Sequence, residues 1–547
     1  MVRTSTKMPG PQKLFLINHK GGFTMKRKKT LFVAATIILV LFLSSLSFSA
    51  EKVQLTGPYD SFRDYIRALE ARGKVLRIKE MDADQYEPTA FLYRMLDKMG
   101  YEEAPAFLIE KVKINGKVME GPVVGNVFCG WDSAAMVYGL DKITNDQREM
   151  YKAVVKKIGS GADSNVQWKK IKPITVDKSK APCKEVIEMG DDVDLYKFAW
   201  VKNNPADVGP YISSGAVFME DPQLGRNVGT YRCQIKAKNK IGVNPEMGQH
   251  GWIFMQRAKK RGEEVMKVAI ALGTDPITYA MSSTKLAGLG VDEIELAGGF
   301  RGKPVEMVKC ETSDLLVPAQ AEMIIEGDVP TGTQETEGPY GEMFGYIGGL
   351  DHKNYYMNIK CITHRKNPII LNSWTGVDKP THMIPWAVSA QLQLKKMLPN
   401  LIEMYSPREA IGITILSIEK RLPGDGMAAG QLVSGARIMG TTKVIIVVDK
   451  DIDPTNITDV LHAVATRWQP YPAGLIIPQS AGMALDPSAP KRMLTSKIVI
   501  DATRQTPDEG GPKSWPPVSR VALEEKAPGA FKLVDQKWAE YWKNWKK

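Results

Sequence analysis

Two acids flank a turn signal in the stretch Glu337-Gly338-Pro339-Tyr340-Gly341-Glu342. Proline lacks the backbone N–H that helices and sheet ladders need, and glycine adopts dihedral angles that other residues avoid. The stretch is therefore predicted to be a turn, not a helix or regular strand, and both acids can point into one cleft. Two carboxylates held close together cannot both ionise without cost, so one is a candidate proton carrier. A solvated glycine-rich turn is the alternative, and the remaining chain must decide between them.

The length and charge of the chain set its broad class. At 547 residues and 60.6 kDa it is too long for one simple core, so two or three domains are expected. Hydrophobic residues make up 43% and charged residues 24%, as in ordinary globular proteins. The formal charge is +12, but the basic residues are spread out, without zinc-finger spacing or an aromatic stacking array. Nucleic-acid binding is therefore not expected.

Cysteine and histidine usage excludes several kinds of site. None of the five cysteines lies in a CxxC pair, which argues against zinc-ribbon and thioredoxin-like sites. An odd number of cysteines gives no disulfide framework, although single bridges remain possible. Only six histidines are present, so a histidine-rich metal cage is excluded.

The N-terminus has the pattern of a targeting signal. A basic cluster, Lys26–Lys29, precedes an apolar run from 31 to 43 and a small-residue stretch from 44 to 50, with cleavage expected after Ser49. Because the apolar run is short for a spanning helix, an uncleaved membrane anchor is the alternative. Met25 stands just before the basic cluster and is an alternative start of translation that keeps this signal. We therefore expect export or membrane tethering, and a cytoplasmic location is the alternative if the start site is misassigned.

The first domain is predicted to be a small α/β unit. After the N-terminal extension and signal or anchor (1–50), residues 51–165 alternate helical and strand patterns. Apolar residues at helical spacing predict a helix over 61–72 with Ser61 as its N-cap, and a strand follows at 75–78.

The centre of the chain is predicted to be rich in β-structure. Residues 166–375 are expected to form a β-barrel or sandwich with inserted helices, and 376–400 a connecting helix, with helical spacing over 385–397. The strands are predicted at 215–219, 228–235, 268–272, 304–309 and 355–363.

A second α/β domain is predicted towards the C-terminus. Residues 401–510 alternate apolar strands with helical segments, which indicates a buried, largely parallel sheet. The tail, 511–547, is rich in proline and then helical over 536–545. The predicted strands lie at 410–417, 443–448 and 497–500, with a helix at 458–467.

Three polar residues form a candidate metal set. Asn227, His250 and Glu293 offer an amide oxygen, an imidazole and a carboxylate, which suit Mn²⁺ or Mg²⁺ with a phosphate completing the shell. Taken singly, each has a structural explanation: an asparagine in a turn, a core histidine and an exposed glutamate. Arg232 lies five residues after Asn227, so in one strand the two would face opposite sides unless a bulge at Gly229 intervenes.

In coherent order over residues 58 to 505, the chain resembles the UbiD family of reversible decarboxylases, which includes ferulic acid decarboxylase and 3-polyprenyl-4-hydroxybenzoate decarboxylase. The segments that carry the resemblance are Asp60-Ser61-Phe62-Arg63, Gly215-Ala216-Val217-Phe218, Asn227 to Arg232, Ala271 to Pro276, Val308-Lys309-Cys310, Glu322 to Gly327, Glu337 to Glu342 and Lys443 to Asp453. The resemblance implies an N-terminal α/β domain, a central split β-barrel that binds flavin, a connecting helix and a C-terminal α/β domain.

The resemblance also implies a cofactor, prenylated FMN (prFMN), whose phosphate is held through Mn²⁺ and K⁺. Asn227, His250 and Glu293 match the family's metal-ligand positions, and Ser283 matches the position beside the potassium ion. The remaining residues expected to contact the cofactor are Gln249, Arg232 and Lys443.

Arg232, Glu337 and Glu342 match the family's catalytic Glu-Arg-Glu network. The activity implied is reversible, non-oxidative decarboxylation of an aromatic or α,β-unsaturated acid through an adduct with prFMN. Arg232 can pair with Glu337 and the incoming carboxylate, while Glu342 is the proton donor.

The export signal stands against this cofactor, which is made in the cytoplasm, and no twin-arginine pair is present. A non-catalytic, exported or membrane-tethered flavin-binding scaffold therefore remains the alternative function. A prenyl-flavin synthase as cofactor supplier and a homo-oligomeric assembly are the partners that the resemblance implies.

Overall fold

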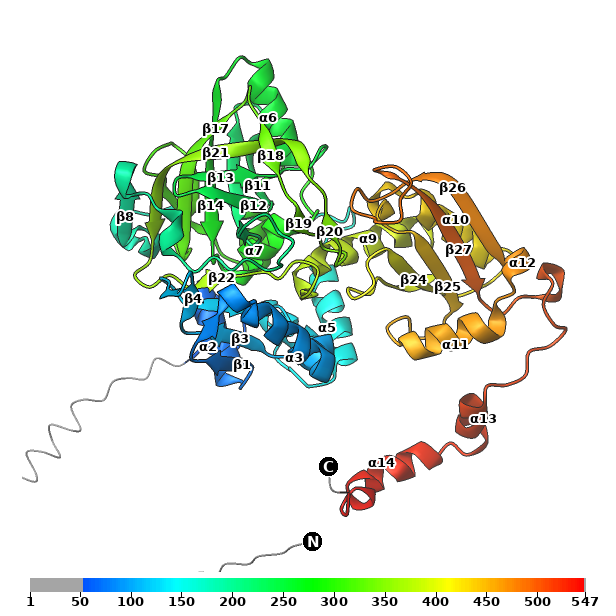
Figure 1. Cartoon of the computed structure of the whole chain (residues 1–547). Coiled ribbons are helices and arrows are strands. Elements are labelled where there is room, and N and C mark those ends of the chain that lie inside the picture. Colours follow the sequence, from blue (N-terminus) through cyan, green and yellow to red (C-terminus); the bar gives the residue numbers. More distant parts are fainter. Residues whose placement is uncertain (1–52, 546–547) are drawn as a thin grey trace, which may run out of the picture. The chain divides into compact units, whose positions relative to one another are not determined.

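The computed structural model describes residues 53–545 (Figure 1). The predicted signal or anchor segment falls outside the described residues. Among the helices that the structure describes, none is both long and apolar enough to span a bilayer.

The first predicted helix and strand are confirmed. Helix α2 (Phe62–Ala71) begins at a capping box, in which the Ser61 hydroxyl accepts from the Asp64 backbone N–H and the Asp64 carboxylate accepts from that of Ser61. Its apolar face is buried. Strand β1 (Val75–Ile78) follows and pairs in parallel with β3 (Ala106–Ile109).

The N-terminal sheet takes a strand from far along the chain. Its order is β1-β3-β6-β22, and β22 (Ile370–Leu371) pairs in parallel with β6 (Val123–Gly125). This pairing ties the first domain to the segment that leaves the central one, and the sequence did not predict it. The other elements of this region are β2 (Met81–Asp82), α3 (Glu87–Glu103), β4 (Val112–Ile114), β5 (Lys117–Val118), α4 (Trp131–Val137) and α5 (Gln147–Gly159).

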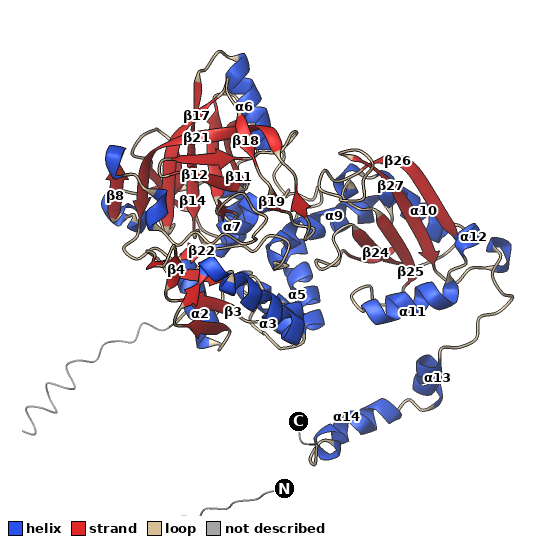
Figure 2. Ribbon diagram, in the orientation of Figure 1, coloured by secondary structure: helices blue, strands red, loops and turns tan. Residues whose placement is uncertain are grey.

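The central domain is built on a ten-stranded sheet with the main order β11-β10-β14-β17-β21-β13-β12-β9. Figure 2 shows the strands of the chain in red and its helices in blue. Its strands are β8 (Val186–Met189), β9 (Tyr211–Ile212), β10 (Ala216–Asp221), β11 (Gly225–Thr230), β12 (Cys233–Ala237), β13 (Lys240–Val243), β14 (Val265–Leu272), β17 (Met323–Pro330), β18 (Glu335–Glu337) and β21 (Asp351–His364). Three helices, α6 (His250–Lys260), α7 (Pro276–Ser283) and α8 (Glu293–Arg301), are inserted between strands, as predicted for this region. A separate three-stranded sheet joins β16 (Leu316–Pro318), β15 (Glu306–Lys309) and β7 (Ile174–Thr175).

Two local predictions need correction. The single strand expected over 228–235 is two strands, β11 and β12, and Arg232 lies in the break between them. No bulge occurs at Gly229, which pairs with Val217 in an unbroken register, so the chain leaves the strand instead. The stretch 337–342 is not free of strand either, because β18 ends at Glu337 and β19 (Tyr340–Gly341) pairs with β20 (Ile347–Gly348).

The C-terminal domain follows α9 (Ile384–Met397), which confirms the predicted connecting helix. Its sheet has the order β23-β24-β25-β27-β26, with parallel pairing at the centre and antiparallel pairing at both edges, so it is only partly parallel. The elements are β23 (Leu401–Tyr405), β24 (Ile413–Ile418), α10 (Asp425–Gly435), β25 (Val444–Asp449), α11 (Ile457–Arg467), α12 (Pro470–Ala473), β26 (Gly474–Ala481) and β27 (Leu494–Ala502). The tail carries α13 (Ser519–Lys526) and α14 (Ala530–Tyr541), neither with a buried residue.

Candidate active site

The three predicted catalytic residues meet in the interior of the central domain. Arg232 donates from Nε and Nη2 to the two carboxylate oxygens of Glu337, at 3.0 and 2.7 Å. Its Nη1 donates to Glu342 Oε1 at 2.5 Å. Glu337 is 1% exposed and Glu342 8% exposed, so two acids share one guanidinium away from bulk water.

The turn between the two acids explains why both reach Arg232. Gly338 has φ of 86°, and a Cβ there would lie 2.6 Å from the backbone oxygen of Gly349. Only glycine fits such a position without strain. After the turn, the Asp207 carboxylate accepts from the Gly341 N–H at 2.8 Å, and the Glu342 N–H donates to the Tyr346 oxygen at 2.8 Å. These bonds fix the backbone that presents Glu342.

Two neighbours that the sequence did not single out hold the guanidinium in place. The Tyr340 ring lies under Arg232, with its centroid 5.2 Å from Cζ, close enough for a cation–π interaction. The Tyr340 hydroxyl is in turn hydrogen-bonded to Ser213 Oγ and Thr375 Oγ1, at 2.6 and 2.7 Å. Asn244, with its amide oxygen turned to Arg232, accepts from Nε and Nη2 at 3.0 and 2.8 Å. Tyr340 lies between the two acids in sequence, which is a usable signal, whereas Asn244 has none.

The pKa values of Glu342 and Arg232, which face each other, are both raised, for different reasons. Burial raises the pKa of Glu342, although the positive charge of Arg232 opposes the shift. Burial works against the charged form of Arg232, but its hydrogen bonds with Glu337 and the charge of Glu342 raise its pKa above the ordinary value. Arg232 therefore stays cationic, and Glu342 keeps its proton to a higher pH than an ordinary carboxyl group does.

Two of the three predicted metal-binding residues, His250 and Glu293, lie side by side, and Glu293 also contacts the strand that carries Asn227. Asn227 lies in β11, and Glu293 and His250 are the first residues of α8 and α6. Glu293 Oε2 accepts from the Val228 N–H at 2.8 Å, while its Oε1 lies 3.9 Å from His250 Nδ1. Burial raises the pKa of Glu293, and His250 opposes the shift. A cation at this position would replace that weak contact and favour the ionised carboxylate.

The donor set limits which metal the site can hold. Within residues 53–545, no group of three or more histidine, cysteine, aspartate or glutamate side chains is arranged for metal binding. A cation here would therefore depend on the Asn227 amide and on an outside ligand such as phosphate. The N-cap of α6, Gln249, makes no side-chain capping bond, and of the first amide groups that of Gly251 donates to the Tyr231 hydroxyl at 3.0 Å. Gln249 instead accepts from the Glu246 N–H at 2.8 Å.

Ser283 and Lys443 differ in where the structure places them. Ser283, the last residue of α7, lies 3.0 Å from Thr230 Oγ1 and so contacts the strand that carries Asn227. Lys443 precedes β25 in the C-terminal domain, where its ammonium group binds Asp486 at 2.9 Å and the Ser488 hydroxyl. Among the described residues, it forms no hydrogen bond or ion pair with the other predicted cofactor residues.

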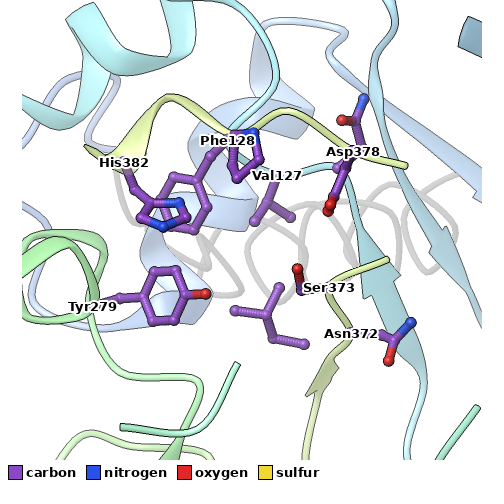
Figure 3. Close-up of a pocket in the computed structure, with 10 residues that line it drawn as sticks. Val127, Phe128, Tyr279, Asn372, Ser373, Asp378 and His382 are labelled. Carbon is purple, nitrogen blue, oxygen red and sulfur yellow. The ribbon is translucent and has the colours of Figure 1, made fainter. Parts of the chain in front are cut away.

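Two recesses border the segment that follows β22. One is lined by Tyr340, Glu342 and Thr375 among others. The other is lined by Phe128, Tyr279, Ser373, Asp378, His382 and five further residues (Figure 3). Thr375 faces the first recess while Ser373 and Asp378 face the second, so one segment separates them.

Comparison with known proteins covers most of the chain. Three families match, described as the N-terminal, Rift-related and C-terminal domains of 3-octaprenyl-4-hydroxybenzoate carboxy-lyase (UbiD), over residues 66–153, 174–378 and 381–502. A phenolic acid decarboxylase from Sedimentibacter hydroxybenzoicus is 32% identical over 86% of this chain and 97% of its own. A phenolic acid decarboxylase from Bacillus subtilis is 30% identical over 85% and 97%.

Solved structures agree with the sequence matches. The open form of the vanillic acid decarboxylase of S. hydroxybenzoicus superposes with a TM-score of 0.72 at 29% identity, covering 87% of this chain and 99% of its own. An evolved dimeric form of the UbiD-class enzyme HmfF from Pelotomaculum thermopropionicum, in complex with prFMN, has a TM-score of 0.69 at 26% identity, covering 87% and 98%. The three domains, their order and these relatives place the chain in the UbiD family of carboxy-lyases.

Proposed function

We propose that this protein decarboxylates an aromatic or α,β-unsaturated carboxylic acid with the help of prFMN, through the network of Arg232, Glu337 and Glu342. The observation that carries the proposal is the sharing of one buried guanidinium by two acids, of which Glu342 has a raised pKa. The phenolic and vanillic acid decarboxylases among its relatives support the substrate class.

The three residues would divide the work. Glu337 holds Arg232 by two hydrogen bonds and keeps the guanidinium fixed. Nη1 is shared with Glu342 alone, so protonation of Glu342 weakens that contact and frees a donor for the substrate carboxylate. When the carbon–carbon bond breaks, CO₂ leaves and the electron pair stays with the organic fragment. Glu342 then delivers its proton to that carbon, and water restores the proton for the next turnover.

The cofactor site is proposed from the chemistry of its donors. Asn227, His250 and Glu293 would hold Mn²⁺ against the phosphate of the flavin, and Ser283 would lie beside K⁺. When bound, prFMN would supply the electron sink that decarboxylation requires. HmfF, a relative of the same class, has been solved with prFMN and with FMN. The contacts of Lys443 with Asp486 and Ser488 give its proposed cofactor role no geometric support.

The proposed partners follow from this chemistry. A prenyl-flavin synthase would supply the cofactor, and a homo-oligomer is proposed because a solved relative is described as dimeric. Export or tethering through the N-terminal apolar segment remains a proposal, argued from the sequence pattern alone.

The proposal is tested by producing the protein together with a prenyl-flavin synthase. Absorbance would report the bound flavin, and decarboxylation and hydrogen–deuterium exchange would be assayed with benzoic and cinnamic acids. We expect turnover of at least one acid by the loaded protein. If the flavin-loaded protein neither decarboxylates any of the acids nor catalyses their hydrogen–deuterium exchange, the result would favour the non-catalytic scaffold.

A further inference from the structure

The two tail helices, α13 and α14, carry apolar residues that no other part of the described chain covers. Neither helix has a buried residue. Both lie beyond residue 502, where the match to the C-terminal domain of the family ends. Their apolar side chains are therefore not part of the core of the carboxy-lyase fold. The large apolar residues left exposed by α14 and the turn after it are Leu533, Val534, Trp538, Tyr541, Trp542 and Trp545.

Most of these residues fall on one side of α14. The turn continues past Tyr541, because the Trp542 N–H donates to the Trp538 oxygen at 3.3 Å and the Trp545 N–H to the Trp542 oxygen at 3.0 Å. The Trp542 ring lies with its centroid 5.5 Å from that of Trp538 and 5.7 Å from that of Trp545. Apolar residues at intervals of three and four share one face of a helix. We call this set the aromatic face: Phe531, Val534, Trp538, Tyr541, Trp542 and Trp545.

Positive charge accompanies the aromatic face. Over residues 530–547 the sequence has five lysines and two acids. The three of these lysines that the structure describes, Lys532, Lys537 and Lys543, are exposed, and none forms an ion pair within residues 53–545. At the start of the face, the Arg520 guanidinium lies over the Phe531 ring, 4.7 Å from its centroid. Lysine side chains can lay their apolar stems along a surface while the ammonium groups reach charges beside it.

The composition of this segment fits a lipid surface better than a protein partner. Tryptophan and tyrosine are enriched where a membrane meets water, because the ring is apolar and its N–H or O–H can reach the headgroups. An aromatic face with lysines on the rest of the helix is typical of helices that lie flat in that interface. Helices that pair with other helices use mainly leucine and isoleucine, and protein interfaces are depleted of lysine. The aromatic face has one aliphatic residue, Val534, and its lysines carry the charge that anionic headgroups complement.

We propose that the aromatic face of α14 binds the surface of an anionic phospholipid bilayer, with the helix lying in the plane of the membrane. The tryptophan and tyrosine rings enter the headgroup region, and the lysines contact the lipid phosphates. The contact is reversible, because stable anchoring needs a second signal besides one interfacial element. This site is separate from the catalytic network, so the inference does not depend on the decarboxylase function. It is also independent of the N-terminal apolar segment.

The test measures flotation of the protein with lipid vesicles. The chain is produced from Ala50, the first residue after the predicted cleavage point, so that the apolar run from 31 to 43 does not itself bind lipid. Vesicles of phosphatidylcholine with about 30% phosphatidylglycerol are compared with vesicles of phosphatidylcholine alone. We expect binding to the anionic vesicles to be at least about tenfold tighter and to weaken as salt is added, because salt screens the lysines.

Two variants of α14 decide whether the aromatic face is responsible. The double variant Trp538→Ala, Trp542→Ala removes its centre and should weaken binding to the anionic vesicles at least about tenfold. The matched control is Leu533→Ala, which removes an exposed apolar side chain from the opposite side of the helix and should leave binding within about twofold. Because all three side chains are exposed, the thermal unfolding of both variants should match that of wild type.

Three results would overturn the inference. The first is an absence of vesicle binding, or binding without preference for the anionic vesicles. The second is an equal effect of the double variant and of Leu533→Ala. The third comes from light scattering without lipid. If the double variant loses an oligomer that wild type forms and its vesicle binding is unchanged, the aromatic face joins copies of this chain instead.

Discussion

Arg232 binds Glu337 through two parallel hydrogen bonds, of 3.0 Å from Nε and 2.7 Å from Nη2, and keeps only Nη1 for Glu342. A two-pronged contact fixes the plane of a guanidinium, whereas a single contact can be exchanged for another. The geometry therefore assigns different parts to two acids that look equivalent in the sequence. Glu337 orients the arginine, and Glu342 is free to gain and lose a proton.

Glu342→Gln should abolish turnover and leave the cofactor bound. Glutamine keeps a hydrogen bond to Arg232 but carries no transferable proton, and loss of a general acid lowers rates by about 10²–10⁴-fold. Single-turnover assays on flavin-loaded protein measure the effect. The control is Glu335→Gln. It removes the charge of a partly exposed acid that lies seven residues before Glu342 and pairs with Lys240. Turnover by Glu342→Gln at the wild-type rate would remove Glu342 from the proton-donor role.

Arg232→Lys should destabilise the protein as well as inactivate it. An ammonium group cannot reproduce the two-pronged contact, so Glu337 is left buried with an incomplete partner. Removing one partner of a buried ion pair costs about 3–5 kcal/mol, and lysine should recover part of this. Urea unfolding of wild type, Arg232→Lys and Arg232→Ala gives the comparison. Equal unfolding midpoints for all three would show that the network does not contribute to stability.

The dependence of stability on pH should reveal the raised pKa of Glu342. A raised pKa means that the folded state holds this proton more tightly than the unfolded chain. This stabilisation is fully present at pH values below the ordinary pKa of a carboxyl group, which Glu342 has in the unfolded chain. It is lost as the pH rises through the higher pKa that Glu342 has in the folded protein. Between these two pKa values, the unfolding free energy of wild type should therefore fall relative to that of Glu342→Gln as the pH rises. A difference that is constant with pH would contradict the shift.

Activity should follow the same titration. Because Glu342 donates from its protonated form, kcat should fall as the pH rises through its raised value. A pH–rate profile of the loaded enzyme measures this decline. Asp378, with its pKa raised to about 7, is a second buried acid whose titration the profile can report, so the profile of Asp378→Asn separates the two groups. A profile that rises with pH over this range would argue for a base at Glu342.

His250→Ala should lower metal and flavin content together. It removes the imidazole beside Glu293 and should reduce both Mn²⁺ and flavin in the purified protein by at least tenfold, as should dialysis against a chelator. Metal analysis and absorbance are the measurements, and His462→Ala, on the exposed face of α11, is the control. Full flavin content in metal-free His250→Ala would show that the cofactor does not depend on this site.

Gly338→Ala should disturb the turn that brings the two acids together. The positive φ and the close approach of the Gly349 oxygen both oppose a Cβ, so we expect a loss of about 1–3 kcal/mol in stability and a lower kcat. The matched control is Gly349→Ala, where a Cβ would meet no atom within 4 Å. If both variants behave alike, the conformation of Gly338 is not what positions the acids.

The sequence predicted the parts of the fold that depend on local signals. The capped helix at 62–71, the connecting helix at 384–397 and the strand at 75–78 follow from apolar spacing, capping residues and breakers. The pairing of β22 with β6 could not be foreseen, because it joins segments about 250 residues apart in the sequence. The antiparallel pairing at the edges of the C-terminal sheet likewise depends on the direction in which β23 and β26 run beside their neighbours. The composition of these strands does not set that direction.

The candidate site divides in the same way. Arg232, Glu337 and Glu342 were predicted as a set, and the structure brings them together. Asn244 was missed because one asparagine in a loop gives no signal until the loop is folded against Arg232. Asp378 and His382 gain their shifted pKa values from burial, which is a property of the tertiary structure.

The most direct test is to follow the proton that replaces the carboxylate on the product. Flavin-loaded wild type and Glu342→Gln are given a hydroxylated benzoic or cinnamic acid in D₂O, and the product is followed by mass spectrometry and NMR. The account predicts one deuterium at the carbon that had carried the carboxylate, formed rapidly by wild type and at least about 100-fold more slowly by Glu342→Gln. Equal rates of deuterium incorporation in the two proteins, or product formation without deuterium, would contradict it.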